Sequence, residues 1–375
     1  MANTKLRCIF FFAVSYLLSD GFVGGRRLGT IESKELFKHK GTVKTIEGKD
    51  GEVIDCVDIY QQPAFNHPLL KNHSIQMESS SSIPNVTNGK LYNAELHQGW
   101  HENGKCPEGT IPIRHAREDD HFAPRIPRQN YDSTGHEYAI AYTNDGHFYG
   151  VHSSHNVWSP VTNFADFSLS QVWISSGPTE EVNTIEAGWQ VTSLSKEPRF
   201  FIYWTSDGYK DTGCYNLECS GFVQTNNAFV IGSFLHPVSS YGATQFEIAI
   251  TIYKSYGNWY LQLQDQVLGY WPRSLFTHLA IGASDLSWGG EIFDSGGQDG
   301  HTSTQMGSGH FPSEGNGKAS FVRNLQYMDG GGKFKDAAVT PHATNPSCYD
   351  ITMQNNVVYG THFYFGGPGH SALCP

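Results

Sequence analysis

The sequence predicts an all-β protein: an antiparallel β-sandwich domain preceded by a small, mainly β segment. The 375 residues include 40 glycines and 13% aromatic residues, a mixture that favours short strands and turns over long amphipathic helices. From residue 136 onward, short runs with alternating or continuous apolar character follow one another, separated by turn sequences. No repeat of propeller length is present. Together these observations favour a sandwich or a barrel.

The first 25 residues have the pattern of a secretory signal peptide. Lys5 and Arg7 precede an apolar run from Cys8 to Leu18, and small residues follow through Gly25. This run is too short to span a membrane, and no other apolar run is long enough. We therefore expect a secreted, extracellular protein with no membrane partner, in which residues 26–127 form a separate segment with a linker and residues 128–375 form the sandwich.

Residues 26–127 contain one clear strand pair, expected at 42–48 and 52–60. The Asp-Gly step at Asp50 and Gly51 supplies the turn between these strands. Asn72-His73-Ser74 and Asn85-Val86-Thr87 match the glycosylation acceptor pattern and fall in what should be exposed loops. A Ser-rich run to Gly89 and a charged, Pro-rich run to Arg128 predict two connectors, the second of them open to proteolysis.

The sandwich strands are expected from residue 136 to residue 365. The first two are joined as a hairpin by Asn144-Asp145-Gly146. The expected strands are 136–143, 147–158, 167–175, 184–194, 199–206, 221–231, 245–255, 258–263, 266–271, 279–283, 290–293, 319–328 and 357–365.

Cleavage of the signal peptide leaves six cysteines, and an even number in a secreted chain predicts disulfides. Proximity in the sequence favours the pairs Cys214–Cys219, Cys348–Cys374 and Cys56–Cys106. A zinc site at Cys214 and Cys219 is the alternative, although no matching second pair of ligands follows.

The composition also limits the kinds of binding partner that we expect. The formal net charge is −11 with neutral histidines, and no basic stripe is available to neutralise phosphates, which argues against nucleic acid. The 18 histidines outnumber this excess of negative charge, so mild acidification reverses its sign, as suits an acidic compartment. Motifs for a serine nucleophile, a zinc helix and a phosphate loop are absent from the sequence. We expect no cofactor and no metal.

The stretch Val182–Val191 places a carboxylate on a predicted strand. Alternation puts Ile185, Ala187, Trp189 and Val191 on one face and Glu186 with Gln190 on the other. Glutamate is depleted in strands, and Gly188 between the two polar residues suggests open space for a ligand. A solvent-facing polar strand face is the simpler interpretation.

A second glutamate, Glu291, lies in a similar setting, among glycines and large apolar residues. If Glu186 and Glu291 faced each other across a cleft, their like charges would raise the pKa of one, so that an acid and a base coexist. Such a pair can activate water and protonate a leaving group. Two exposed glutamates that never meet are the alternative.

The triplets Asp211-Thr212-Gly213 and Asp294-Ser295-Gly296 offer another pair of carboxylates. This Asp-Thr/Ser-Gly motif occurs in aspartic peptidases, in which two carboxyl groups share a proton. The same motif is common in ordinary turns. The Ser308 and His310 pair is favoured as part of a glycine-rich turn, because adjacency in sequence does not make a catalytic triad.

The ordered set of these motifs resembles the neprosin family of secreted plant glutamic, proline-directed endopeptidases. The resembling stretches are 55–60, 62–76 and 106–114 in the N-terminal segment, and 171–174, 183–191, 288–291 and 304–309 in the sandwich. The resemblance implies an N-terminal activation segment that acts as an intramolecular inhibitor, and Glu186 and Glu291 as the catalytic carboxyl groups.

The sequence and the resemblance together predict the zymogen of an acid glutamic endopeptidase that cleaves peptide substrates after proline. Gln190 is a candidate to orient water or bind the oxyanion, or a plain strand glutamine. Pro124 and Pro127 in the linker are candidate processing sites. The alternatives are a two-glutamate glycoside hydrolase and a non-catalytic wall or carbohydrate-binding protein.

Overall fold

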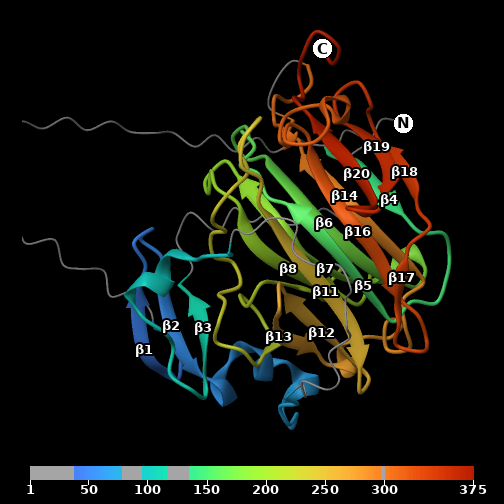
Figure 1. The fold of residues 1–375 in the computed structure, drawn as a ribbon. Coiled ribbons are helices and arrows are strands. Elements are labelled where there is room, and N and C mark those ends of the chain that lie inside the picture. The colour runs from blue at the N-terminus through green and yellow to red at the C-terminus, as the bar shows by residue number, and fades with distance from the viewer. Residues whose placement is uncertain (1–37, 78–94, 116–134, 297–299) are drawn as a thin grey trace, which may run out of the picture. The chain divides into compact units, whose positions relative to one another are not determined.

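The computed structural model describes residues 38–77, 95–115, 135–296 and 300–375, which form three antiparallel sheets (Figure 1). Strands make up 44% of the described residues and helices 8%. A sheet of three strands comes first in the chain, and sheets of seven and ten strands follow. The predicted all-β class, with a small β segment before a larger antiparallel β region, is confirmed.

The three-stranded sheet belongs to the N-terminal segment. Its strands are β1 (Thr42–Glu47), β2 (Val53–Asp58) and β3 (Thr110–Arg114), in that order. Gly51 takes a left-handed φ of 76° in the turn between β1 and β2, which an Asp-Gly step accommodates. Sequence reasoning missed β3, which contains a proline at position 112 and lies on the edge of the sheet, where the missing N–H is tolerated.

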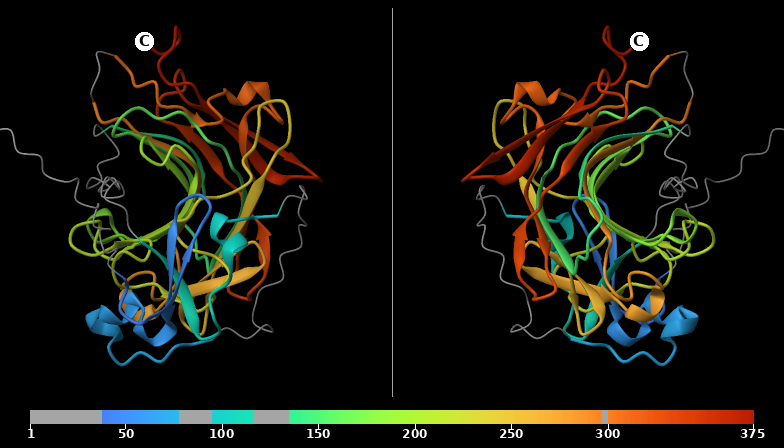
Figure 2. Two further views of the ribbon diagram at one scale, coloured as in Figure 1. Left: turned by 90° about the vertical axis from the view of Figure 1, so that its left-hand side faces the viewer. Right: turned by 90° about the vertical axis from the view of Figure 1, so that its right-hand side faces the viewer.

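The seven-stranded sheet carries both candidate glutamates. In Figure 2 it is strongly curved, and its concave side faces away from the other large sheet. In spatial order its strands are β18 (Thr340–Ala343), β4 (His136–Tyr142), β14 (Asp285–Phe293), β6 (Phe167–Ser176), β7 (Asn183–Thr192), β8 (Arg199–Thr205) and β9 (Cys214–Tyr215).

The ten-stranded sheet packs against the convex side of the seven-stranded sheet. Eight strands follow one path: β10 (Val223–Gln224), β13 (Gln266–Trp271), β12 (Asn258–Leu263), β11 (Glu247–Ser255), β5 (Gly150–Asn156), β16 (Ser320–Met328), β20 (Gly360–Gly367) and β15 (Met306–Gly307). Off this path, β17 (Phe334–Asp336) pairs with β16, and β19 (Asp350–Asn356) pairs with β20.

The described helices are all short 3-10 turns. They are η1 (Ile59–Gln61), η2 (Pro63–Asn66), η3 (Pro68–Leu70), η4 (Gly99–Asn103), η6 (Thr179–Glu181), η7 (Arg273–Leu275) and η8 (Pro312–Glu314). Within the described ranges, no helix has the length and apolar character needed to cross a membrane.

The main core lies between the two large sheets. The alternation predicted for Val182–Val191 is present: Ile185, Ala187, Trp189 and Val191 are all fully buried in this core. Trp189 also links the sheets, because its indole N–H donates to the carbonyl of Asn156 on β5 at 3.0 Å. The inner face of β7 therefore fixes which side chains β7 presents on its outer face.

Several expected strands differ in the structure. The predicted hairpin around Asn144-Asp145-Gly146 is wrong, because β4 lies in the seven-stranded sheet and β5 in the ten-stranded sheet. Of 221–231 only Val223 and Gln224 form a strand, and much of the remainder contacts the N-terminal segment. Residues 279–283 form a turn with one isolated bridge, and 290–293 is the end of the longer strand β14. Sequence reasoning also missed β18 and β19, whose mostly exposed residues lack a clear apolar alternation.

The N-terminal segment contacts the region of the two large sheets through side chains that imitate a β-ladder. The amide of Gln62 donates to the carbonyl of Gln224 and accepts from its N–H, at 3.0 and 2.8 Å. Gln98 makes the same two hydrogen bonds with Val230, at 2.9 and 2.8 Å. Val230 in turn packs inside the small core of the segment, with Trp100 and others.

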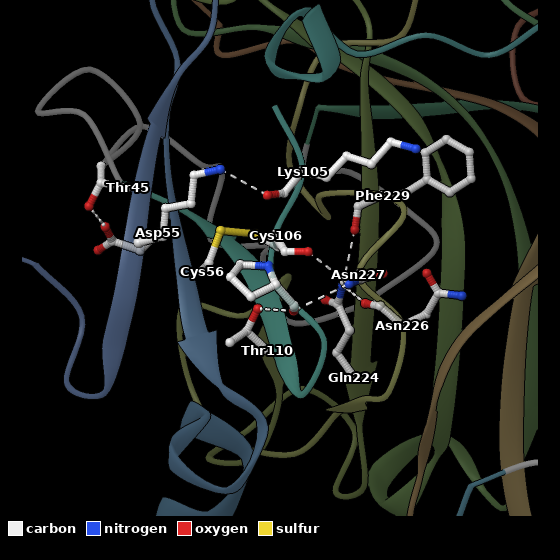
Figure 3. Close-up of a disulfide and its surroundings, with 12 residues drawn as sticks. Thr45, Asp55, Cys56, Lys105, Cys106, Thr110, Gln224, Asn226, Asn227 and Phe229 are labelled. Atoms are coloured by element: carbon white, nitrogen blue, oxygen red, sulfur yellow. Dashed lines mark hydrogen bonds between the residues drawn. A yellow bond between two sulfur atoms is a disulfide. The ribbon is translucent and has the colours of Figure 1, made fainter. Parts of the chain in front are cut away.

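Three disulfides join the same cysteine pairs that proximity in the sequence favoured: Cys56–Cys106, Cys214–Cys219 and Cys348–Cys374. Because Cys214 and Cys219 are bonded to each other, the zinc alternative is wrong. The first disulfide holds the loop before β3, where the Cys106 carbonyl accepts a hydrogen bond of 3.1 Å from the Asn227 side chain (Figure 3).

We expect Trp189→Ala to lower the free energy of unfolding by about 3–5 kcal/mol, because it leaves a cavity between the sheets and removes the donor to Asn156. Guanidinium unfolding of the full chain measures this. Val357→Ala is the control. The side chain of Val357 is fully exposed, so the free energy of unfolding of this variant should stay within about 0.5 kcal/mol of the wild-type value. Equal effects of the two changes would contradict the assignment of the core.

Candidate active site

Glu186 lies on the outer face of β7, and this face is not solvated. Glu186 is only 2% exposed and Gln190 only 5% exposed, so the expectation of a solvent-facing polar strand is wrong. Aromatic side chains on neighbouring strands, among them Phe201 and Tyr203 of β8, lie on the same face and help to cover it. A carboxyl group in this position has lost most of its water.

The carboxyl group of Glu186 is held by three donors. Its Oε1 accepts from the hydroxyls of Tyr209 at 2.7 Å and Thr184 at 3.0 Å, and its Oε2 lies 3.3 Å from the amide nitrogen of Gln171. Burial raises the pKa of Glu186 to about 7; the Tyr209 hydroxyl opposes this shift and the nearby Glu291 adds to it. Glu186 therefore carries a proton in acidic solution.

Tyr209 reaches Glu186 from an unusual loop between β8 and β9. Its φ of 61° is left-handed, a conformation that costs energy for a bulky residue. Asp207 holds this loop by accepting hydrogen bonds from the backbone N–H groups of Lys210, Asp211 and Thr212. Burial raises the pKa of Tyr209 well above its ordinary value, so the phenol remains a donor.

Glu291 lies on the outer face of β14 and is 5% exposed. Its Oε1 is bonded to Nδ1 of His136 at 2.5 Å and accepts from the Tyr138 hydroxyl at 3.3 Å. Its Oε2 lies 3.4 Å from the amide nitrogen of Gln171. The His136 contact fixes Oε1, so Oε2 is left facing the same point as Oε2 of Glu186.

Gln171 joins the two glutamates, because one amide nitrogen contacts both Oε2 atoms. The register explains how it fits: Gln171 on β6 lies opposite Gly188 of β7 and opposite Gly289 of β14. A Cβ on Gly188 would lie 2.6 Å from the Cβ of Gln171 and 2.1 Å from the Ser170 carbonyl. The expected open space at Gly188 is therefore absent; the glycine admits the close approach of β6.

A cavity of about 140 Å³ lies beside the pair. It shares Tyr138 with the surroundings of Glu291, and Thr184 and Tyr209 with those of Glu186, and Trp173 forms part of its wall. The rings of Tyr138 and Trp173 meet edge to face at 6.5 Å. The site thus combines two buried carboxyl groups with a small aromatic cavity.

The structure does not bring Gln190 to the pair. Gln190 accepts a 2.5 Å hydrogen bond from Tyr215, and in the described part of the chain it bonds to neither glutamate. The two aspartate triplets also stay apart: Asp294 accepts from Gly296 in its own turn, and Asp211 donates its N–H to Asp207. Each triplet is an ordinary turn, which removes the structural basis for an aspartic dyad.

The remaining predicted sites divide by location. Asn72 is exposed, as a glycan acceptor must be. Asn85, Pro124, Pro127 and the signal peptide lie outside the described residues. His310 bonds to Glu314 at 2.8 Å and its N–H to the Ser308 hydroxyl, so these residues form a turn.

His39, Asp55 and His115 are a group that could hold a metal ion. Their ligand atoms lie within 4.8 Å of one another. Burial acts to raise the pKa of Asp55, but hydrogen bonds from the His39 N–H, Thr45, His115 and the His39 ring outweigh it and lower the pKa to about 2. These hydrogen bonds already satisfy the carboxylate without a metal.

The sequence analysis did not identify the residues that hydrogen-bond to the two glutamates, which are Gln171, Tyr209, His136, Tyr138 and Thr184. The available signal for Gln171 was a polar residue in a strand whose predicted neighbours carry glycines. Tyr209 gave no signal, because Gly208-Tyr209-Lys210 is indistinguishable in sequence from an ordinary turn.

Two protein-family models match the chain. Residues 165–368 match the family model described as Neprosin, and residues 45–142 match the model described as Neprosin activation peptide. The structure is similar to scytalido-glutamic peptidase with a transition state analog inhibitor, at 13% identity and a TM-score of 0.36, over 62% of this chain and 98% of that chain. It is also similar to SCP-B, a member of the Eqolisin family of peptidases, at 13% identity and a TM-score of 0.33, over the same two shares.

The raised pKa of Glu186 predicts a pH dependence of stability. The folded pKa of about 7 lies above the ordinary unfolded value, so the stabilisation is complete below about pH 4.5 and is lost as pH rises through 7. Between pH 4.5 and pH 8, the free energy of unfolding measured in urea should fall by about 3 kcal/mol more for wild type than for Glu186→Gln. The variant has no proton to lose at this position.

Glu180→Gln is the matched control for this experiment, because it makes the same chemical change at a side chain that is 82% exposed. Identical pH profiles for wild type and Glu186→Gln would show that the folded pKa of Glu186 is ordinary.

Proposed function

The chain belongs to the neprosin family, and from this membership we propose that it is the zymogen of a secreted acid glutamic endopeptidase that cleaves after proline. The observation that carries the proposal is the contact of one amide nitrogen, from Gln171, with both Glu186 and Glu291. Two carboxyl groups in one dry site, one of them with a pKa of about 7, supply an acid and a base at the same place.

In the proposed reaction Glu291 is the base and Glu186 the acid. Glu291 takes a proton from a water molecule, whose oxygen attacks the carbon of the scissile carbonyl. Glu186, protonated on Oε2, gives its proton to the carbonyl oxygen as the tetrahedral intermediate forms. When the intermediate collapses, the C–N bond breaks, the leaving amine takes the proton from Glu291, and Glu186 regains its own.

The assignment of roles follows from the hydrogen bonds. Oε1 of Glu186 already accepts from Tyr209 and Thr184, so the proton that the raised pKa retains belongs on Oε2, the atom that faces Gln171. Oε1 of Glu291 is held by the His136 ring, which leaves its Oε2 to take the proton of the attacking water. The Gln171 amide remains available to donate to the developing oxyanion.

The aromatic cavity supports the preference for proline. Trp173 and Tyr138 offer flat apolar faces to a pyrrolidine ring, and the volume of about 140 Å³ suits a small side chain rather than a large aromatic one. Proline also brings a rigid backbone, which lowers the entropy lost on binding.

The N-terminal segment supports the zymogen proposal. It contacts the catalytic region through Gln62, Gln98 and the shared packing of Val230, and these contacts require the segment to be folded in place. The signal-like N-terminus, the disulfides and the exposed Asn72 support secretion to an oxidising, acidic location.

We expect Glu186→Gln and Glu291→Gln each to lower kcat/KM for a proline-containing reporter peptide by about 10³-fold or more, because each removes a proton transfer. The assay runs between about pH 2.5 and 7 on secreted protein after acid incubation, and circular dichroism confirms folding. Glu180→Gln should keep wild-type activity. An inert wild type whose N-terminal segment has gone would refute the peptidase proposal, and sugar binding would then be assayed.

Gln171→Ala should lower kcat by about 10²-fold and change KM much less. The reason is that the amide acts on the intermediate and not on the bound substrate. Gln190→Ala is the matched control on the same face. Equal losses for the two variants would show that Gln171 serves only the packing of the sheet.

If the protein releases its own N-terminal segment, acid incubation of wild type should yield a new N-terminus directly after Pro124 or Pro127, and Glu291→Gln should yield none. Mass spectrometry of the products reads this directly. A mature N-terminus far from these prolines would contradict self-processing there.

A further inference from the structure

Arg199 lies on the same face of the curved sheet as the catalytic pair. The strand register places it opposite Gln190, and Gln190 lies opposite Leu169, which lies opposite Glu291. Residues directly opposite one another on paired strands project from the same face. Glu291 and Arg199 therefore belong to one row that crosses the concave face from β14 to β8.

In the zymogen this arginine binds a carboxylate of the N-terminal segment. Glu52, at the turn before β2, is 1% exposed, and its Oε1 accepts a hydrogen bond from Nη1 of Arg199. Its Oε2 accepts one from the hydroxyl of Ser233. Both donors belong to the catalytic region, so the region contains a two-pronged site for one carboxylate.

Two contacts within the catalytic region orient Arg199. The guanidinium carbon of Arg199 lies 3.7 Å from the centre of the Phe234 ring, and Nη1 also donates to the Gly232 carbonyl at 2.8 Å. Neither contact involves the N-terminal segment. Removal of the segment takes Glu52 away and leaves the guanidinium oriented by Phe234 and Gly232.

We propose that Arg199 and Ser233 form a carboxylate-binding subsite of the mature enzyme, which Glu52 of the N-terminal segment occupies in the zymogen. This inference rests on the proposed peptidase function and adds a substrate class to it: peptides with an acidic residue at a fixed distance from the scissile proline. Glu52 thus imitates an acidic side chain of the substrate.

The register gives the distance. Three strand spacings separate Arg199 from Glu291 in their row, or about 14 Å at about 4.8 Å per strand. An extended peptide advances about 3.3 Å per residue, so a peptide that crosses the strands meets Arg199 about four residues from the cleaved bond.

Other charges around the subsite do not replace this function. Arg114, 3.8 Å from Glu52, belongs to the N-terminal segment and leaves with it. Glu218, a carboxylate of the catalytic region near the subsite, lines a cavity of about 530 Å³ together with Arg114 and Gly232. Tyr215, whose hydroxyl donates to Gln190, lies on the edge strand β9, on the side of β8 away from β7.

The test compares pairs of peptides that differ only by glutamate or glutamine, placed in turn at each position on both sides of proline. The enzyme is made as the full chain, cut in the linker by its own activity or at an inserted protease site, and freed of its N-terminal segment. At about pH 6 we expect glutamate to be preferred about tenfold in kcat/KM at one position. The preference should vanish below about pH 4 as the peptide carboxylate gains a proton.

Arg199→Gln should reduce the glutamate-to-glutamine ratio to about one, Arg199→Lys should keep part of it, and Ser233→Ala should lower it a few-fold. Arg273→Gln, which removes an exposed arginine of the same region, should leave the ratio at its wild-type value. A ratio of one at every position in wild type, or a ratio that Arg199→Gln does not change, overturns the subsite.

Binding separates this inference from the peptidase proposal. Calorimetry with the segment-free Glu291→Gln protein should show tighter binding of the glutamate peptide than of its glutamine partner. If this difference is found while wild type cuts no peptide, the subsite stands and the proposed reaction fails. If wild type cuts both peptides equally and the two bind equally, the reaction stands and the subsite is wrong.

Discussion

The site depends on the burial of two carboxyl groups on the outer face of a β-sheet. A carboxylate removed from water is costly unless it is neutralised or hydrogen-bonded. Both solutions are present here. Glu186 keeps a proton because burial raises its pKa to about 7. Glu291 is bonded to His136, and Gln171 contacts both groups through one amide nitrogen. The surrounding sheet must supply these partners at fixed positions, and the inner face of β7, locked by Trp189 and its neighbours, provides that rigidity.

The N-terminal segment is attached by a different kind of contact. Gln62 and Gln98 satisfy the backbone of a stretch that would otherwise present unpaired N–H and carbonyl groups at the edge of the catalytic region. Such groups bind water well when the segment leaves, so the exchange is close to balanced. The Glu52 contact with Arg199 and Ser233 is of another type, because separation leaves a cationic group on the catalytic face. That difference is why we propose this contact, and not the two glutamine contacts, as a substrate subsite.

Several parts of the structure were within reach of sequence reasoning. The all-β class followed from glycine-rich turns and short apolar runs, and the faces of β7 followed from alternation, because a strand with one face in a core has only one register that buries it. Glu186 and Glu291 stood out as glutamates within apolar strands. The neighbours of the pair did not stand out. Tyr209 reaches Glu186 only because Asp207 bends its loop into a left-handed turn, and nothing in Gly208-Tyr209-Lys210 reveals the direction of that side chain.

The sequence by itself determined the alternation of β7, the six cysteines available for disulfides and the presence of two glutamates in unusual strands, because these are local properties of short stretches. Only the tertiary structure decided that Gln171, and not Gln190, joins the pair, and that the polar face of β7 is buried. Both depend on which strand lies beside which: Gln171 fits because Gly188 and Gly289 lie opposite it on the two adjacent strands, and β14 is more than a hundred residues away in sequence. The pairing of distant strands is set by the packing of the whole core, and no local pattern records it.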